Sequence, residues 1–372
     1  MCSSDLVPRY RELRSGDLID NGVALGGLIH KMGWRGTTST ILNFGEQREC
    51  LGELVGEPHR GLQYMFQMMN EARIGVGRAG TALSYAAYRH ALEYARTRHQ
   101  GRLPGEKDPH RPPVAIIEHP DVRRMLLAQK SIVEGALSLI LECAHLVDEE
   151  HTASDDATRS RAAALLEVLT PIAKAWPGEA GQEAISLALQ TLGGYGFARE
   201  YPIERLYRDN RLNPIHEGTN GVQALDLLGR KVRQDNGGAF RALLNRMRET
   251  AHNATDALPN LAAELRTAVD RVETVTATLV SSREEPARAL ANATAYLDLV
   301  RRTVIAWLWL RQAHVAASAL PIATLDDERA FYQGKVQAAR YWFGWELPRT
   351  VQLAELLSRA DAVPFEMQDA WF

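Results

Sequence analysis

The hydrophobic period of the chain changes between residues 58 and 62, and this change constrains the fold more than any other sequence feature. Residues 7–58 are punctuated by glycines between short β-prone pieces, such as Thr37 to Phe44 and Cys50 to Val55. From Leu62 onward, apolar residues recur at the i, i+3, i+4 spacing of amphipathic helices. We therefore expect a mainly α-helical protein in which a strand-rich segment precedes a long helical region.

The segment 7–58 has few apolar residues and room for about four strands, which is too little for a stable sheet of its own. It is interpreted as the C-terminal strands of a larger middle β-domain. Residues 1–6 are interpreted as an artefact, because Cys-Ser-Ser-Asp-Leu back-translates to a common sequencing adapter. Under this hypothesis the native sequence starts near Val7, and an in-frame stop codon just upstream of Met1 would contradict it.

Residues 59–234 predict a helical bundle. Its expected helices run from Leu62 to about Arg98, from Pro120 to Asp148, from Arg161 to Leu192 with interruptions at Pro171 and at Trp176-Pro177-Gly178, and from Thr219 to Val232. Proline at the first turn of the second helix, and Thr219 or Asn220 as an N-cap of the last, are typical helix starts. The glycine- and proline-rich stretch Gly101 to Pro113 predicts a loop.

Asp235-Asn236-Gly237-Gly238 predicts a linker, and residues 239–372 predict a second helical domain. Its expected helices are Phe240 to Asn253, Leu258 to Ser281, Glu285 to Ala316 and Asp326 to Leu357. Their apolar stripes include the aromatic residues Trp307, Trp309, Tyr341, Trp342, Phe343 and Trp345, whose helical spacing favours a core or subunit contact over a ligand pocket.

The overall composition excludes several classes of protein. The 43 basic and 46 acidic residues give a net charge of −3, which argues against constitutive nucleic-acid binding. No apolar run reaches the length of about 18 residues that a membrane span needs. The three cysteines are scattered and odd in number, so they indicate neither a disulfide framework nor a metal cluster, and a reducing, cytoplasmic setting fits them best.

Two short stretches have the residue types of a functional site. Gly193, Gly194 and Gly196 permit close backbone approach by a ligand, a helix or a neighbouring chain, although an ordinary turn between helices also fits. Glu217 lies in a loop directly before a helix, where a carboxylate can project into a cleft as a general base and free backbone N–H groups can bind an oxyanion. A solvated turn residue before a capped helix fits the same residues.

Several motifs, in order, resemble the C-terminal half of the acyl-CoA dehydrogenase family. The motifs are Lys31-Met-Gly-Trp-Arg35, Asn70-Glu-Ala-Arg73, Tyr94-Ala-Arg-Thr-Arg-His-Gln100, Gln190-Thr-Leu-Gly-Gly-Tyr-Gly-Phe197, Tyr201-Pro-Ile-Glu-Arg-Leu-Tyr-Arg-Asp209 and His216-Glu-Gly-Thr-Asn-Gly-Val-Gln-Ala-Leu-Asp226. The resemblance covers residues 7 to 232. The extension, with Tyr341-Trp-Phe-Gly-Trp-Glu-Leu-Pro348, resembles that of the larger branch, which includes 3-methylmercaptopropionyl-CoA dehydrogenase-like enzymes.

The resemblance implies an oxidoreductase that uses FAD for α,β-dehydrogenation of an acyl-CoA thioester. Glu217 matches the family base, which removes a proton from Cα while hydride leaves Cβ for flavin N5. Hydrogen bonds to the thioester oxygen acidify that proton, and desolvation raises the pKa of the carboxylate toward that of its target. His216, beside the base, is interpreted as a packing residue and not as a proton shuttle.

The resemblance also implies ligand contacts. The FAD contacts carried over are Arg98, Gln100, Gln190, Gly193, Gly194 and Thr219, of which Arg98 and Gln100 reach the cofactor across a subunit interface in the family. Arg73 and Gly218 match substrate contacts, although a buried ion pair is equally plausible for Arg73. Two positions depart from the family pattern: Gly101 replaces an aromatic residue and Leu192 replaces a common histidine.

The expected partners are an acyl-CoA substrate, an electron-transfer flavoprotein as electron acceptor, and further copies of the chain in a homodimer or homotetramer. A DNA-binding stress-response flavoprotein of the same fold is an alternative, but it predicts a strongly basic C-terminal region, and residues 239–372 mix arginine with many acidic residues. A truncated, inactive fragment is a second alternative. On this interpretation the family's N-terminal helical domain and part of its flavin cleft are missing from the sequence, so weak FAD binding and little turnover are expected.

Overall fold

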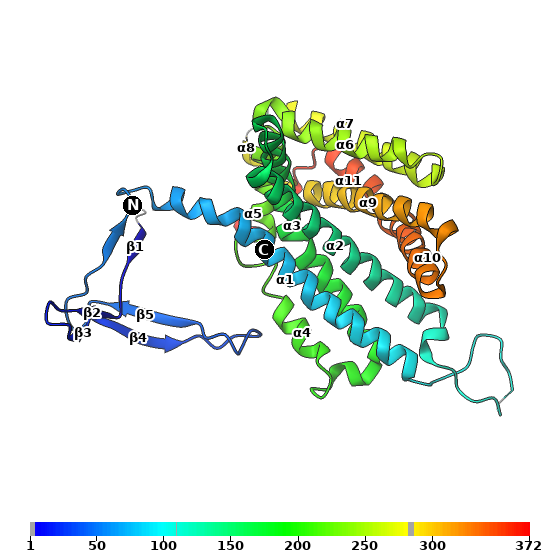
Figure 1. The fold of residues 1–372 in the computed structure, drawn as a ribbon, viewed down its shortest axis with the longest axis horizontal. Helices are drawn as coiled ribbons and strands as arrows, with labels where there is room; N and C mark the ends of the chain where they lie inside the picture. The colour runs from blue at the N-terminus through cyan, green and yellow to red at the C-terminus, as the bar shows by residue number, and fades with distance from the viewer. Residues whose placement is uncertain (1–3, 109, 282–285) are drawn as a thin grey trace. The chain divides into compact units, whose positions relative to one another are not determined.

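The structure is a computed structural model that describes residues 4–108, 110–281 and 286–372 (Figure 1). It is mainly α-helical, as the sequence predicts, and it divides into two compact units, one ending at Ala72 and the other comprising Arg73–Phe372. The first three residues, including Cys2, and Glu285, where the sequence predicts a helix start, lie outside the described residues. Within the described ranges, no helix is long and apolar enough to cross a membrane.

The first unit is built from short antiparallel strand pairs. Its pairs are β1 (Ser4–Leu6) with β6 (Glu53–Val55), β2 (Tyr10–Glu12) with β3 (Leu18–Asp20), and β4 (Val23–Leu28) with β5 (Thr40–Phe44). Apolar residues such as Leu25 and Phe44 are more than half exposed. The fully buried Asn21 connects the pieces instead, because its side chain donates to Pro8 O and Leu51 O, both at 2.8 Å.

The four helices expected for the bundle are present. They are α1 (Gly61–Thr97), which begins in the first unit and continues in the second, α2 (Pro120–Thr152), α3 (Asp156–Leu192) and α5 (Asn220–Asp226), which continues as a π-turn over Leu227–Lys231. The short helix α4 (Ile203–Asn210), between α3 and α5, was not predicted. Pro120 occupies the first turn of α2, as predicted. The Asp155 side chain caps α3 by accepting from the Thr158 N–H at 2.8 Å.

The prediction that Pro171 and Pro177 interrupt the third helix is wrong, because α3 is continuous through both. Proline at 177 removes the N–H that would bond to the Ala173 carbonyl. A Cβ added at Gly77 of α1 would lie 2.0 Å from that carbonyl oxygen, so α1 approaches it directly. Glycine in α1 therefore lets the two helices cross closely at the carbonyl that Pro177 leaves without its helical partner.

The chain after the bundle is helical in shorter pieces than expected. Its helices are α6 (Gly238–Asn253), α7 (Pro259–Ser281), α8 (Pro286–Ala289), α9 (Ala293–Ala319), α10 (Asp326–Tyr341), α11 (Arg349–Ser358) and α12 (Val363–Glu366). The predicted helix 285–316 is divided by a turn at residues 290–292. The predicted helix 326–357 is divided at a π-turn, Trp342–Glu346, followed by Pro348, which has no N–H to continue the helix.

The bundle and the C-terminal helices share one core. In Figure 1, α6 lies along α7, and α9 lies between this pair and α10. Two buried tryptophans of α9 connect the bundle to the C-terminal helices. Trp309 Nε1 donates to Ser131 O of the bundle helix α2 at 3.0 Å, and Trp307 Nε1 donates to Thr250 Oγ1 of the C-terminal helix α6 at 2.8 Å. The segment predicted as a linker is a tight turn with φ of 50° at Asp235 and 53° at Asn236, between two parts of one compact unit.

Candidate functional site

Residues 211–219, between α4 and α5, form a turn that carries Glu217 and is termed the acidic turn. Asparagine side chains hold it against α3 through hydrogen bonds. Asn210 Nδ2 donates to Gly178 O of α3 at 2.9 Å, and Asn213 Nδ2 donates to Asn210 Oδ1 at 3.0 Å. His216 Nε2 lies 3.3 Å from Asn213 Oδ1. A Cβ added at Gly178 would lie 3.1 Å from Asn213 Cβ, so the absence of a side chain there permits the close contact.

Glu217 has a backbone conformation that non-glycine residues rarely adopt. Its φ is 54°, and that of Gly218 is 84°, so two consecutive residues are left-handed. The fully buried Gln223 fixes this geometry, because its Nε2 donates to Glu217 O at 3.3 Å and to Gly218 O at 3.2 Å. Such a conformation costs about 1–3 kcal/mol and is concentrated at functional sites. The Glu217 side chain is exposed on this rigid turn.

The start of α5 leaves a hydroxyl unused for capping. Thr219 occupies the N-cap position, as the sequence predicts, but its side chain makes no capping hydrogen bond. Asn220, the other predicted cap, instead donates from Nδ2 to Glu179 Oε2 of α3 at 2.9 Å. The exposed Thr219 side chain, two residues after Glu217, therefore has no role in capping the helix.

Arg73 forms a buried ion pair. Its Nη1 lies 3.0 Å from Asp226 Oδ2, which joins α1 to the end of α5, and only 8% of Arg73 is exposed. The exposed Arg230 also approaches Asp226, with 3.5 Å between Nη1 and Oδ1. The guanidinium of Arg73 thus has a structural partner at the position where the resemblance implies a substrate contact.

Lys174 of α3 is a residue of this site that the sequence reasoning missed. It is 0% exposed, and its Nζ has no hydrogen-bond partner among the described residues. Burial, with added repulsion from Arg73, lowers the pKa of Lys174 to about 8, while the Glu217 carboxylate opposes this shift. A single lysine within the apolar helical run from Ile172 to Trp176 was the available signal.

His216 responds to the same charges. Burial lowers the pKa of the His216 imidazole from its ordinary value of 6.5, Lys174 lowers it further, and Glu217 acts in the opposite direction. At neutral pH the imidazole is therefore uncharged. Two other buried residues that the sequence reasoning did not assign, Gln223 and Asp226, lie within the motif that carries Glu217, and their place in that motif was the available signal.

The glycine-rich turn lies at the other end of the bundle, beside Arg98. Arg98, Leu192 and Tyr195 line a hollow of about 550 Å³ next to the end of α1. Gly193 has a φ of 59° and ends α3, and a Cβ added at Gly194 would meet no heavy atom within 4 Å.

The remaining positions of this turn divide into packed and open ones. A Cβ added at Gly196 would lie 2.3 Å from Leu189 O, so Gly196 is required for packing. The exposed side chain of Gln190 and the open space at Gly194 leave this face accessible to a ligand. Leu192, one of the departures from the family pattern, is 4% exposed and belongs to the core.

Gln100 is held through its backbone. Its N–H donates to Val114 O at 2.9 Å, and its carbonyl lies 2.8 Å from His119 Nε2. Gly101, the second departure, has a φ of 70°, which favours glycine at this turn. An aromatic side chain would be strained there, so the departure follows from the local backbone.

The structure therefore gathers the candidate residues into two groups. Arg73 lies about a third of the way along α1 and Arg98 directly follows its end, which places them about 37 Å apart at 1.5 Å per residue. Glu217, Gly218 and Thr219 lie with Arg73 around Lys174, whereas Gln100, Gln190, Gly193 and Gly194 lie with Arg98.

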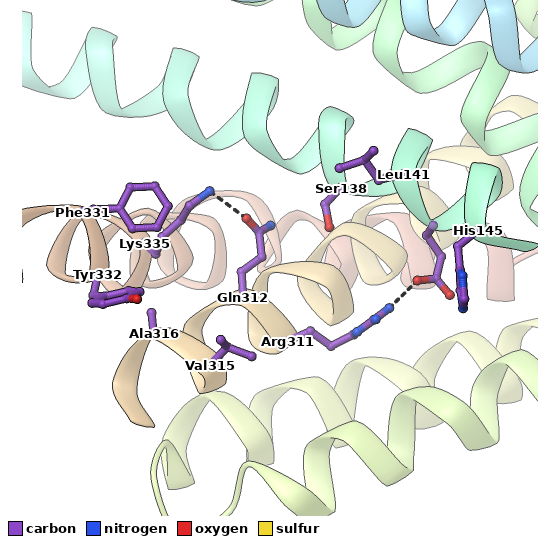
Figure 2. Close-up of a pocket in the computed structure, with 11 residues that line it drawn as sticks. Ser138, Leu141, His145, Arg311, Gln312, Val315, Ala316, Phe331, Tyr332 and Lys335 are labelled. Atoms are coloured by element: carbon purple, nitrogen blue, oxygen red, sulfur yellow. Dashed lines mark hydrogen bonds and ion pairs between the residues drawn. The ribbon is translucent and has the colours of Figure 1, made fainter. Parts of the chain in front are cut away.

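A further hollow, of about 440 Å³, lies between α2, α9 and α10 (Figure 2). Arg311 and Lys335, two of its charged side chains, already have polar partners. Arg311 Nη1 lies 2.5 Å from Glu142 Oε2, and Lys335 Nζ donates to Gln312 Oε1 at 2.9 Å and to Glu134 Oε2 at 2.9 Å. This hollow contains none of the candidate residues.

The helical bundle, the glycine-rich turn and the left-handed acidic turn together define the C-terminal fold of the acyl-CoA dehydrogenases. Two family models match the chain, one described as "Acyl-CoA dehydrogenase, C-terminal domain" over residues 59–232 and the other as "Acetyl-CoA dehydrogenase C-terminal like" over residues 243–368. The chain belongs to the acyl-CoA dehydrogenase family. The resemblance inferred from the motifs is confirmed.

Curated relatives are similar over most of the chain. The broad-specificity linear acyl-CoA dehydrogenase FadE5 of Mycobacterium tuberculosis is 32% identical over 95% of this chain and 60% of its own length. The 3-methylmercaptopropionyl-CoA dehydrogenase of Ruegeria pomeroyi is 35% identical over 90% of this chain and 56% of its own length. The chain thus spans at most about three fifths of the length of these two relatives.

Solved structures share the fold. The structure of Caenorhabditis elegans ACDH-11 in complex with C11-CoA has a TM-score of 0.72 at 18% identity, covering 95% of this chain and 60% of that one. An acyl-CoA dehydrogenase complexed with FAD from Bacillus anthracis has a TM-score of 0.67 at 18% identity, covering 95% of this chain and 64% of that one. The predicted fold class is confirmed by these likenesses.

Proposed function

We propose that the protein is an FAD-dependent acyl-CoA dehydrogenase in which Glu217 is the base for α,β-dehydrogenation of an acyl-CoA thioester. The observation that carries this proposal is the acidic turn, where two left-handed residues hold an exposed carboxylate that interacts electrostatically with the buried cation Lys174. A solvated turn residue would need neither the strained backbone nor the fully buried Gln223 that clamps it.

The residues that we propose for the cofactor suit a long, anionic group. Arg98 offers a planar, permanently charged donor for phosphate, and Gly194 leaves open space for close approach to the backbone. The free Thr219 hydroxyl beside Glu217 suits a contact near the reacting atoms. Bound FAD would supply the hydride acceptor.

Because Arg98 and Thr219 lie in different groups, we propose that Arg98 and Gln100 contact FAD of another subunit in a homodimer or homotetramer.

In this mechanism the carboxylate of Glu217 takes the proton from Cα of the thioester. We infer that backbone N–H groups of the turn, at Glu217 and Gly218, hold the thioester oxygen and stabilise the negative charge that develops on it. The rigid turn fixes the carboxylate in advance, which removes much of the entropic cost of positioning it. Electron-transfer flavoprotein is the proposed acceptor of the electrons.

The experiment is anaerobic addition of acyl-CoA thioesters of graded chain length to the purified chain saturated with FAD. Bleaching of the flavin absorbance with formation of enoyl-CoA is expected, and Glu217→Gln should keep the oxidised spectrum. The matched control is Glu200→Gln, at an exposed glutamate in the turn before α4, which should bleach normally. Normal bleaching by Glu217→Gln would remove Glu217 from the mechanism.

A further inference from the structure

Lys174 lies where α1, α3 and the acidic turn meet. The residue before it, Ala173, contacts Gly77 of α1 through its carbonyl, since a Cβ added there would lie 2.0 Å away. Gly178, one helical turn further along α3, contacts Asn213 and Pro214 of the acidic turn. Residues four apart share one face of a helix, so Lys174 is on the face of α3 that the acidic turn covers.

The charges around Lys174 leave it with one counter-charge. Arg73, the other buried cation, is bound by Asp226 at 3.0 Å. His216 is neutral when its pKa is lowered below its ordinary value. Glu217 is therefore the anion that attracts the Lys174 ammonium. Within the part of the chain that the structure describes, the Glu217 carboxylate forms no ion pair with another residue.

A lysine in this position is costly to keep. Its side chain is fully buried, and no acceptor among residues 4–108, 110–281 and 286–372 bonds to its Nζ. An apolar side chain of similar length would fill the same space without a buried charge. Lys174 therefore reduces stability close to Glu217, the candidate base. Loss of stability at a candidate site is expected of a residue that is retained for function.

We propose that Lys174 is a positioning residue whose ammonium, buried beneath the acidic turn, attracts the Glu217 carboxylate and holds it in place. This inference rests on the proposed function of Glu217. The ammonium would oppose displacement of the carboxylate when an acyl chain covers the turn and removes water from it. Lys174 itself takes no proton from the substrate, so its contribution is to orientation and charge.

The direct test is NMR titration of the purified full chain carrying 13Cε-labelled lysine, with the Lys174 signal assigned by its loss in Lys174→Met. We expect a titration midpoint near pH 8 for Lys174. Glu217→Gln removes the favourable charge and should lower this midpoint by about one pH unit, a tenfold change in the proton affinity. Glu200→Gln, the matched control, should leave the midpoint unchanged.

A second signal checks the same coupling from the other side. The pKa of His216 is lowered in part by Lys174, so Lys174→Met should raise the His216 midpoint in a histidine ring 15N titration. An unchanged Lys174 midpoint in Glu217→Gln would overturn the inference, and so would an unchanged His216 midpoint in Lys174→Met. These titrations need neither FAD nor substrate, so they can fail while flavin bleaching succeeds, or the reverse.

The functional effect is measured by the rate of flavin reduction. Lys174→Met should lower this rate about tenfold, equivalent to one pKa unit of interaction, and Lys174→Arg, which keeps the charge, should recover part of it. A purely structural role predicts equal rates in Lys174→Met and Lys174→Arg when both fold, and that result would contradict the positioning role.

Discussion

The helical unit contains two clusters of buried charge that differ in whether their charged groups form close ion pairs. In the Glu142 cluster, at the hollow of Figure 2, Glu142 is held by Arg246 at 2.9 Å and by Arg311 at 2.5 Å. In the Lys174 cluster, formed by Lys174, His216 and Glu217, the ammonium has no hydrogen-bond partner within the described ranges.

The difference distinguishes charged residues that hold helices together from charged residues that remain available to a substrate. A carboxylate that forms ion pairs with two arginines fixes the packing of the helices that supply them, here α2, α6 and α9. A partly paired network reduces stability, and its unused capacity is available to a substrate or to a group that must change charge during reaction. The comparison therefore predicts that the same substitution has opposite effects in the two clusters.

The largest expected effect is on the rate at the Lys174 cluster. Glu217→Gln removes the proton acceptor but keeps the side chain's shape, so we expect flavin reduction to fall by about 10³-fold. Because the exposed side chain loses only its attraction for the Lys174 ammonium, the free energy of unfolding at pH 7 should fall by about 1 kcal/mol, as a one-unit change in the Lys174 pKa implies. Stopped-flow absorbance and urea denaturation measure the two quantities. A large loss of stability would show that Glu217 mainly stabilises the fold.

The same substitution in the Glu142 cluster should have the opposite result. Glu142 is 5% exposed and serves two arginines, so Glu142→Gln leaves both arginines without a charged partner. We expect the free energy of unfolding to fall by about 3 kcal/mol, measured by urea denaturation, with an unchanged rate of flavin reduction below the unfolding transition. A changed rate with unchanged stability would reverse the comparison.

Lys174→Met should stabilise the protein at pH 7 by about 2 kcal/mol, because it removes a buried ammonium that lacks a hydrogen-bond partner in the described structure. The sign depends on pH. The folded pKa of about 8 lies below the ordinary value of 10.5, so between these values the unfolded state binds more protons and wild-type stability rises with pH.

The gain of the variant over wild type should therefore shrink between pH 7 and pH 9.5, as measured by urea denaturation at both values. Lys231, a buried lysine that pairs with Glu167 at 3.0 Å, provides the control. Lys231→Met should destabilise the protein instead. Equal loss of stability in both variants would show that Lys174 is paired in solution.

The smallest expected effect concerns the glycine turn beside Arg98. Gly194→Ala adds a methyl group into open space, so the free energy of unfolding should change by less than about 0.5 kcal/mol. If FAD approaches the protein backbone at Gly194, the added methyl group should lower the affinity for FAD, measured by fluorescence titration, about tenfold. Gly196→Ala is the contrasting variant, because its Cβ would meet Leu189 O at 2.3 Å and should unfold the turn.

The sequence predicted the helical bundle well because amphipathic period and helix starts are local signals. Pro120 and the apolar stripe from Leu62 set the two long helices close to their observed bounds. The continuity of α3 through Pro177 was not predictable from local sequence. It depends on Gly77, about a hundred residues earlier, which brings α1 against the freed carbonyl.

The candidate site was predicted only where its residues belong to a motif. Glu217 and Thr219 were named from the sequence, whereas Lys174 lies 43 positions before Glu217 on another helix. Its burial and its lack of a partner in the described structure arise from the packing of α1 and the acidic turn on α3. The pairing of Arg73 with Asp226 is likewise a long-range contact, which the sequence left open as one of two alternatives.

The central claim is that Glu217 removes the α-proton of an acyl-CoA thioester. The most direct measurement is deuterium incorporation at Cα, followed by mass spectrometry, when the FAD-saturated chain is incubated with acyl-CoA in D2O. The account predicts incorporation with the wild-type chain and with Glu200→Gln, and incorporation at the rate of the protein-free control with Glu217→Gln. Equal incorporation by the wild-type chain and Glu217→Gln would contradict it.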